Sequence, residues 1–89
     1  MFTVTWTQAA LDDLSAIWLA ADPSVRRKVT KVSAQLDQHL RANGDRMGES
    51  RSDGERIYLV DPLGLEFSVS APDRLITVTR VWRDRKSVV

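Results

Sequence analysis

The feature of this sequence that most limits its fold is a single change of hydrophobic period, about half-way along the chain. Before Asp45, apolar residues recur at three- and four-residue steps, as they do on one face of a helix. After Gly54 they alternate with polar residues, as they do in a strand with one buried face. Helices followed by strands indicate an α+β domain rather than a parallel sheet with crossover helices.

The chain opens with a short alternating segment, Phe2 to Trp6, which predicts a strand. Thr7 is a suitable N-cap for the helix that follows. Asp12 and Asp13 lie near its first turn, where negative charge suits the helix dipole, so we interpret both as structural rather than catalytic. The apolar stripe expected to face the core, with Trp18 in it, comprises Ala10, Leu11, Leu14, Ile17, Trp18 and Ala21.

A second helix is expected after Asp22-Pro23, because proline disfavours a helical residue before it and fits the first position of a new helix. Val25 to Leu40 contains a buried stripe at helical spacing, with cations over much of the remaining surface. Asn43-Gly44 predicts a left-handed C-terminal cap. The two helices would form an antiparallel hairpin.

The second half is expected to be a three-stranded antiparallel meander that follows a polar loop over residues 45–54. Its strands are expected over residues 55–60, 65–70 and 74–83. The predicted architecture is β-α-α-β-β-β, with the helical hairpin packed on one face of a small antiparallel sheet. Residues 1–89 are too few for a second domain.

Composition excludes several classes of site. The absence of cysteine removes disulfides and thiolate metal sites, and one histidine, His39, cannot form a histidine pair for a metal. The sequence contains no phosphate-binding glycine loop and no dinucleotide motif, so we expect no cofactor and no metal. It also lacks an apolar run of membrane-spanning length and a signal peptide, so we expect a cytoplasmic protein without membrane contact.

Arginine remains as a candidate for chemistry. Arg51 and Arg56 lie in the loop and the strand after it, whereas Arg80 and Arg83 end the last strand. The guanidinium stays charged, and its planar fork of donors matches phosphate. If the two groups converge, they form an anion site at one end of the sheet. In the alternative interpretation, the loop arginines only pair with the four carboxylates of residues 45–55.

The cations near the C-terminus are less balanced by carboxylates. Asp84 is the only acidic residue beside Arg80, Arg83, Arg85 and Lys86, although the net charge of the whole chain is only +1. We therefore expect an anionic partner to meet this end of the chain rather than the whole surface.

Two aromatic residues each have two possible roles. Trp82 either stacks on a nucleobase or packs, over the end of the sheet or under an antitoxin-like partner. Tyr58 shares a strand face with Arg56 and either donates a proton or hydrogen bond to phosphate or packs at the rim of the core. Strict alternation would place Arg80 and Trp82 on the strand face of Val78.

Together these segments resemble the RelE/ParE superfamily of toxins over nearly the whole chain. The likeness lies in the order of elements, the length and loosely patterned positions. The segments that carry it are Ala9-Ala10-Leu11-Asp12-Asp13-Leu14, Leu36 to Leu40, Gly48-Glu49-Ser50-Arg51, Glu55-Arg56-Ile57 and Arg80-Val81-Trp82-Arg83.

The resemblance implies the toxin of a bacterial type II toxin–antitoxin module, held inactive by a cognate antitoxin protein. RelE-like members cut messenger RNA in the ribosomal A site, so the ribosome and its message would be the target of an mRNA endonuclease. ParE-like members inhibit DNA gyrase instead. The third alternative is a non-toxic protein-interaction domain of the same fold, which the near-zero net charge favours.

The resemblance also implies site residues. Arg56 falls where RelE-like members place a basic residue on the second strand, Arg51 falls in the preceding basic stretch, and Arg80 and Arg83 fall at the basic end of the last strand. Two positions depart from the pattern: Glu66 stands where many members have an arginine, and Trp82-Arg83 stands where some have a histidine or tyrosine acid.

Cleavage of RNA by attack of its 2′-hydroxyl needs a base, an acid and cations around the phosphate. Arginine can supply the cations but is a poor base or acid because its pKa lies above about 12. Glu66 or Glu49 as base and Tyr58 as acid are the remaining candidates. The predicted catalytic set is Arg51, Arg56, Tyr58, Arg80 and Arg83.

Overall fold

The computed structural model describes residues 1–84, so Arg85 and Lys86 lie outside the described residues. Seven main elements follow one another, with short 3-10 turns at Gly44–Arg46 and Ser52–Gly54. They are β1 (Thr3–Trp6), α1 (Gln8–Ala20), α2 (Pro23–Asn43), β2 (Glu49–Ser50), β3 (Glu55–Val60), β4 (Leu63–Ser70) and β5 (Leu75–Arg83). The predicted α+β architecture is confirmed.

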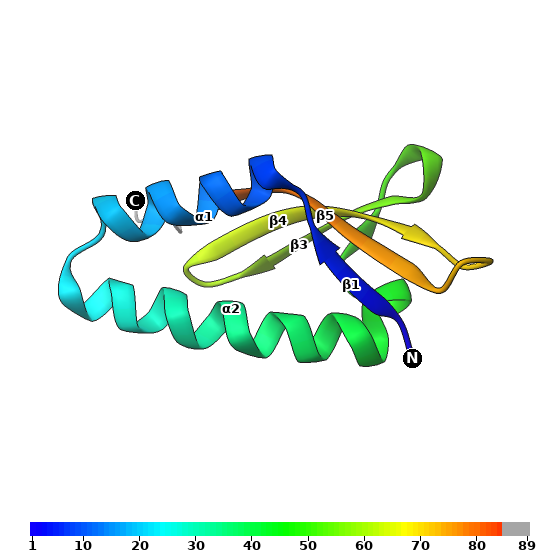
Figure 1. The fold of residues 1–89 in the computed structure, drawn as a ribbon, viewed down its shortest axis with the longest axis horizontal. Helices are drawn as coiled ribbons and strands as arrows, with labels where there is room; N and C mark the ends of the chain where they lie inside the picture. The colour runs from blue at the N-terminus through cyan, green and yellow to red at the C-terminus, as the bar shows by residue number, and fades with distance from the viewer. Residues whose placement is uncertain (85–89) are drawn as a thin grey trace.

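One five-stranded sheet has the order β1-β5-β4-β3-β2, and the helical hairpin packs against it (Figure 1). Strands β2 to β5 pair antiparallel, whereas β1 runs parallel to β5, as the long connection between these two strands allows. The predicted loop over residues 45–54 contains β2, which pairs Glu49 with Ile57 and Ser50 with Arg56. Two residues are too few to show an alternating pattern.

Both helix N-termini follow local chemistry, whereas the C-terminus of α2 follows tertiary packing. Thr7 Oγ1 accepts a hydrogen bond from the Ala10 N–H, and Asp22 Oδ1 accepts one from the Val25 N–H, so both predicted N-caps are confirmed. The left-handed cap at Gly44 is wrong, because its φ is −56°. A Cβ at Gly44 would collide with the Ile76 side chain, so close packing accounts for the glycine.

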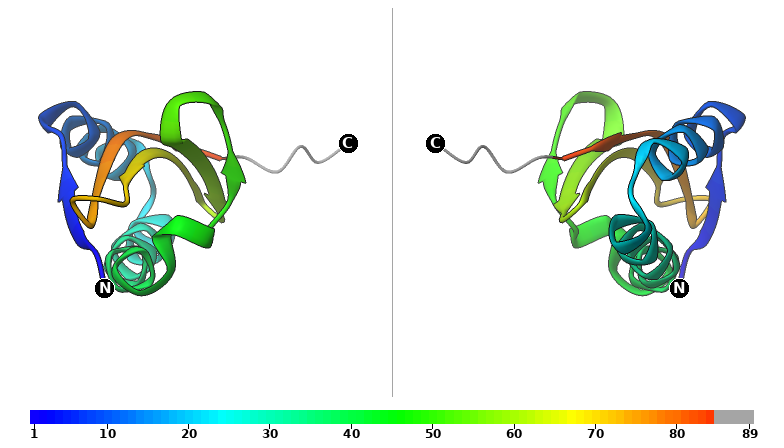
Figure 2. Two further views of the ribbon diagram at one scale, coloured as in Figure 1. Left: turned by 90° about the vertical axis from the view of Figure 1, so that its right-hand side faces the viewer. Right: turned by 90° about the vertical axis from the view of Figure 1, so that its left-hand side faces the viewer.

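The core lies between α2 and the inner face of the sheet, which wraps around this helix (Figure 2). Val29, Leu36 and Leu40 of α2 are buried against Leu65 and Phe67 of β4. By contrast, Ala10 is the only fully buried residue of α1. The sheet and α2 therefore supply most of the buried apolar surface.

A β-bulge divides β5 into two halves. Phe67 pairs with Val78 but Glu66 pairs with Arg80, so Thr79 is an extra residue in β5. Its hydroxyl donates a hydrogen bond to the Glu66 carbonyl oxygen at 3.1 Å. An extra residue reverses the alternation, so the expectation that Arg80 lies on the face of Val78 is wrong.

Helix α1 lies beside β5 beyond the end of β1 and is tied to it by polar contacts. The Thr7 N–H donates to the Val78 carbonyl at 3.0 Å. Asp13 Oδ2 then accepts a hydrogen bond from the Val81 N–H at 3.0 Å. This backbone donor has no strand partner on that side, so the interpretation of Asp13 as structural holds through a contact between elements.

Candidate functional site

The two predicted groups of arginines do not converge. β3 and β5 run in the same direction, so Arg51 and Arg56 near the start of β3 lie at the opposite end of the sheet from Arg83 at the end of β5. Arg56 is level with Phe67, and Arg83 is level with Leu63, a separation of about 13 Å along the strands at 3.3 Å per residue.

Arg56 and Tyr58 share the inner face of β3, as alternation predicted. Arg56 Nε donates to the Met47 carbonyl at 2.7 Å, and Nη2 donates to the Gly48 carbonyl at 3.2 Å. Tyr58 packs against the core. Arg56 therefore holds the loop in place. Tyr58 has the contacts expected of a residue that packs at the rim of the core. Arg51 is exposed and lies 3.7 Å from a Glu49 carboxylate oxygen.

Arg80 and Trp82 lie together on the outer face of the sheet. Arg80 is exposed beside Glu66 on the neighbouring strand, and Trp82 is level with Gly64. A Cβ at Gly64 would collide with the indole, so Trp82 lies flat against the β4 backbone. The outer face thus places one arginine, one carboxylate and one aromatic ring side by side.

Arg83 faces the other side of the sheet from Arg80, toward the turn of the helical hairpin. Hydrogen bonds from the Val25 N–H and the Ser24 hydroxyl lower the pKa of Asp22, and the positive charge of Arg83 adds a smaller effect in the same direction. Nε of Arg83 is buried and has no hydrogen-bond partner within the described residues. Arg80 and Arg83 therefore cannot act on one phosphate group from the same face.

Within residues 1–84, no three histidine, cysteine or acidic side chains are grouped as a metal site would need. No helix in this part of the chain has both the length and the apolar character to cross a bilayer.

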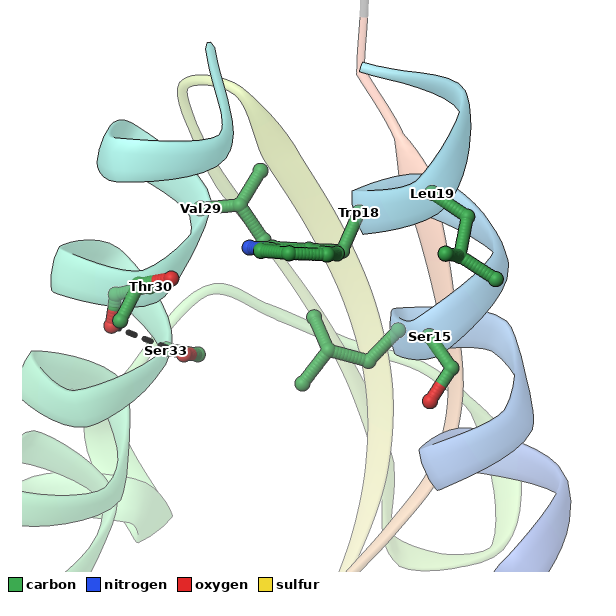
Figure 3. Close-up of a pocket in the computed structure, with 7 residues that line it drawn as sticks. Ser15, Trp18, Leu19, Val29, Thr30 and Ser33 are labelled. Carbon is green, nitrogen blue, oxygen red and sulfur yellow. Dashed lines mark hydrogen bonds between the residues drawn. The ribbon is translucent and has the colours of Figure 1, made fainter. Parts of the chain in front are cut away.

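A hollow of the surface lies between α1 and α2, where the sequence predicted core. Trp18 is 40% exposed and Leu19 is 68% exposed, so the burial predicted for Trp18 is wrong. The indole projects from α1 toward Val29 and Thr30 of α2 (Figure 3). A hollow of about 370 Å³ is lined by Leu14, Ser15, Trp18, Leu19, Val29, Thr30 and Ser33. We call this hollow the interhelical groove.

Arg26, in the first turns of α2, contacts the end of α1 that carries Trp18. Its guanidinium carbon lies 4.5 Å from the centre of the Trp18 ring, which is a stacking contact. Its Nε donates to the Trp18 carbonyl at 2.9 Å, and its Nη2 donates to the Leu19 carbonyl at 3.0 Å. Both carbonyls lie in the last turn of α1, and the Trp18 carbonyl also accepts from the Ala21 N–H at 3.2 Å. Arg26 thus helps to cap α1 and also fixes the indole.

The interhelical groove is bordered by positive charge. A second hollow, of about 310 Å³, is lined by Trp18, Arg26, Arg27, Thr30 and Lys31. Helix α2 carries five cationic side chains and one carboxylate, a charge of +4, whereas the other described side chains carry six cations and eleven carboxylates, a charge of −5. The strongest positive surface is therefore α2.

Three of the five cations of α2 lie near the end of the helix that disfavours positive charge. Arg26, Arg27 and Lys28 lie in the first two turns, near the positive end of the helix dipole. A charge of the unfavourable sign costs about 0.3–1 kcal/mol in the first turn at low salt when exposed, and less in the next turn. A cluster that opposes the dipole and borders an open apolar groove has the properties of a binding surface for an anionic partner.

Sequence reasoning missed this groove although the sequence contains a signal for it. Leu11, Trp18 and Leu19 extend the apolar side of α1 well beyond the roughly 100° stripe that a helix needs to face a core. Periodicity alone cannot show which part of a wide apolar arc the neighbouring helix covers.

No family model matches the sequence, and no curated protein matches it. Solved structures do. A chain of the chromosomal ParDE toxin–antitoxin system from P. aeruginosa is similar at 24% identity and a TM-score of 0.72, covering 96% of this chain and 98% of that one.

Two further structures agree with it. A chain of the RelBE2 toxin–antitoxin complex from Mycobacterium tuberculosis is 20% identical with a TM-score of 0.72, and it covers 92% of this chain and 90% of that one. The isolated E. coli RelE toxin is 16% identical with a TM-score of 0.62, covering 98% and 88%. This chain has the RelE/ParE fold.

Proposed function

We propose that this chain is the toxin of a bacterial type II toxin–antitoxin module, and that its antitoxin binds in the interhelical groove. The supporting observation is an exposed apolar groove with a cationic border in a RelE/ParE fold. Similar chains occur in ParDE and RelBE toxin–antitoxin complexes. The groove and the fold together favour a function in which a protein partner covers the apolar surface of the groove.

An amphipathic helix is the kind of segment that fits a hollow between two helices. Its apolar face would cover Leu14, Trp18 and Leu19, each of which gains from removal from water at about 25 cal/mol per Å² of buried apolar surface. A segment that orders only on binding loses part of this gain to conformational entropy. Such an antitoxin would be labile when free and stable when bound.

For the target, we propose inhibition by binding, as in ParE-like toxins, rather than cleavage of RNA. Cleavage needs several cations around one phosphate. Arg56 is occupied by loop carbonyls, Arg83 faces the helices, and Arg80 stands beside Glu66. Tyr58, the candidate acid, is partly buried and packs against the core, which favours its packing role.

Two leucines test the antitoxin site. Leu19→Ser changes the groove and Leu59→Ser changes the outer face of the sheet, and both side chains are mostly exposed, at 68% and 57%. We expect the complex with the antitoxin encoded by the neighbouring short reading frame to weaken at least tenfold for Leu19→Ser and less than twofold for Leu59→Ser. Isothermal titration measures both. Equal affinities would refute the groove as the antitoxin site.

Induction of the toxin alone tests the target. A gyrase inhibitor leaves translation running and triggers DNA damage, whereas an mRNA endonuclease stops protein synthesis and leaves cleaved messages on ribosomes. We expect the first pattern. Cleaved messages would overturn the binding mechanism, and normal growth would favour the non-toxic interaction domain.

A further inference from the structure

The interhelical groove and the second hollow meet at Trp18 and Thr30. These two residues line both hollows, and the first is otherwise lined by three apolar side chains and two hydroxyls, Leu14, Leu19, Val29, Ser15 and Ser33. The second is otherwise bounded by cationic side chains, Arg26, Arg27 and Lys31. The indole therefore lies between an apolar compartment and a cationic compartment.

The position of the indole is fixed by a residue of α2 as well as by α1. Arg26 stacks on the ring at 4.5 Å and donates hydrogen bonds to the carbonyls of Trp18 and Leu19. A guanidinium with three contacts to the end of α1 limits the directions that the indole can take. Arg26 is thus a positioning residue for Trp18 and is itself not free to meet a carboxylate with its full fork.

Two cations of the second compartment are free for a partner. Arg27 and Lys31 lie one helical turn apart on α2, and both are exposed. Within residues 1–84 neither forms an ion pair or a side-chain hydrogen bond, in contrast to Arg41, which is 2.9 Å from an Asp37 carboxylate oxygen. Their charges point to a partner that carries carboxylates.

We propose, on the basis of the proposed function, that the bound segment carries a large apolar side chain and a carboxylate about one helical turn apart. The apolar side chain enters the compartment of Leu14 and Val29, and the carboxylate meets Arg27 and Lys31 across the indole. One turn of a helix advances about 5.4 Å, and residues three or four apart lie on the same side of it, so one helix can present both side chains to the two hollows. Trp18 and Arg26 thereby determine the spacing that the groove accepts.

Selection from a displayed library of helical peptides, with the full-length protein as bait, tests this spacing. Peptides whose binding is lost with Leu19→Ser are groove binders, and we expect them to be enriched in Asp or Glu three or four residues from a large apolar residue. Changing that acid to its amide should weaken binding about threefold to tenfold in low salt, the scale of an exposed charge cluster.

The matched variants remove equal charge at different places. With Arg27→Gln/Lys31→Gln we expect the acid-to-amide change to cost less than twofold, whereas with Lys28→Gln/Arg46→Gln the cost should stay as in the unchanged protein. Arg26→Met should broaden the preferred spacing, and Arg26→Lys should partly restore it. A thermal melt of each variant verifies that it is folded.

Each outcome decides between the two proposals. Groove binders without an acid at this spacing, or an acid preference that survives Arg27→Gln/Lys31→Gln, overturn the compartment proposal and leave the antitoxin site intact. A library without groove binders overturns both. Exposed apolar residues beside cations also suit an anionic bilayer. Co-sedimentation with phosphatidylserine vesicles that is lost with Leu19→Ser, without peptide binding, would assign the groove to lipid instead.

Discussion

The inner face of the sheet and the facing sides of the two helices differ in how completely they are buried. Leu63, Leu65 and Phe67 of β4 are fully buried. Between the helices, Trp18 and Leu19 remain in contact with solvent. Both regions are apolar in sequence. The difference therefore shows that an apolar side chain need not be buried in the chain's own core and can instead be available for a partner.

This difference separates residues that stabilise the fold from residues available for binding. Removing a buried leucine leaves a cavity, whereas removing an exposed one leaves water in contact with a smaller side chain. Four comparisons test how clearly the residues that stabilise the fold differ from those that do not.

The largest effect is expected from two leucines of the helical hairpin. Leu36→Ala removes a buried side chain of α2 and should lower the free energy of unfolding by about 2–5 kcal/mol. Leu19→Ala, on the exposed side of α1, should change it by less than about 0.5 kcal/mol. Urea denaturation measures both. Similar losses would mean that the groove closes in solution.

The next effect concerns the polar contact that fastens α1 to β5. Asp13→Ala leaves the Val81 N–H without its acceptor and should cost about 1–3 kcal/mol. Asp12 is exposed and accepts a hydrogen bond only from Gln8, so Asp12→Ala is the control, with an expected change below about 0.5 kcal/mol. Thermal melts that fall equally would show that α1 is held chiefly by its apolar residues.

A smaller loss of stability is expected for one arginine of the sheet than for the changes above, and almost none for another. Arg56→Gln removes charged donors from the Met47 and Gly48 carbonyls and should cost about 1–2 kcal/mol, with faster amide exchange in residues 44–54. Arg80→Gln, on the outer face, should leave stability within about 0.5 kcal/mol. If Arg56→Gln were as stable as the parent but lost toxicity, Arg56 would belong to a functional site.

The smallest effect is the pH dependence of the α2 cap. Hydrogen bonds from the Val25 N–H and the Ser24 hydroxyl lower the pKa of Asp22 below its usual 3.8. The folded state therefore gains stability from this carboxylate above pH 3.8, and loses it as the pH falls through the lower pKa. Between about pH 5 and about pH 3, Asp22→Asn should lose less stability than the parent. Urea denaturation of both proteins across this pH range measures the difference. Equal losses of stability would show that the Asp22 cap does not contribute to acid destabilisation.

The sequence predicted the fold more completely than it predicted the candidate site. The change of period and the caps at Thr7 and Asp22 predicted both helices, because these signals act between neighbours in the chain. The predicted arginines share no site, because their convergence depends on strand direction and register. The bulge had a visible sign, since the apolar residues of β5 fall at Ile76, Val78 and then Val81, a step of two followed by a step of three.

The sequence by itself determined the α+β class, the order of elements, the helix N-termini and the inner face of β3, where Arg56 and Tyr58 point the same way. These features depend on period, capping and alternation, which are local. Only the tertiary structure decided which side of β5 carries Arg80, since one extra residue at Thr79 reverses the faces. It also decided that Trp18 borders a groove, because burial depends on whether another surface covers a side chain, and within residues 1–84 none does so fully.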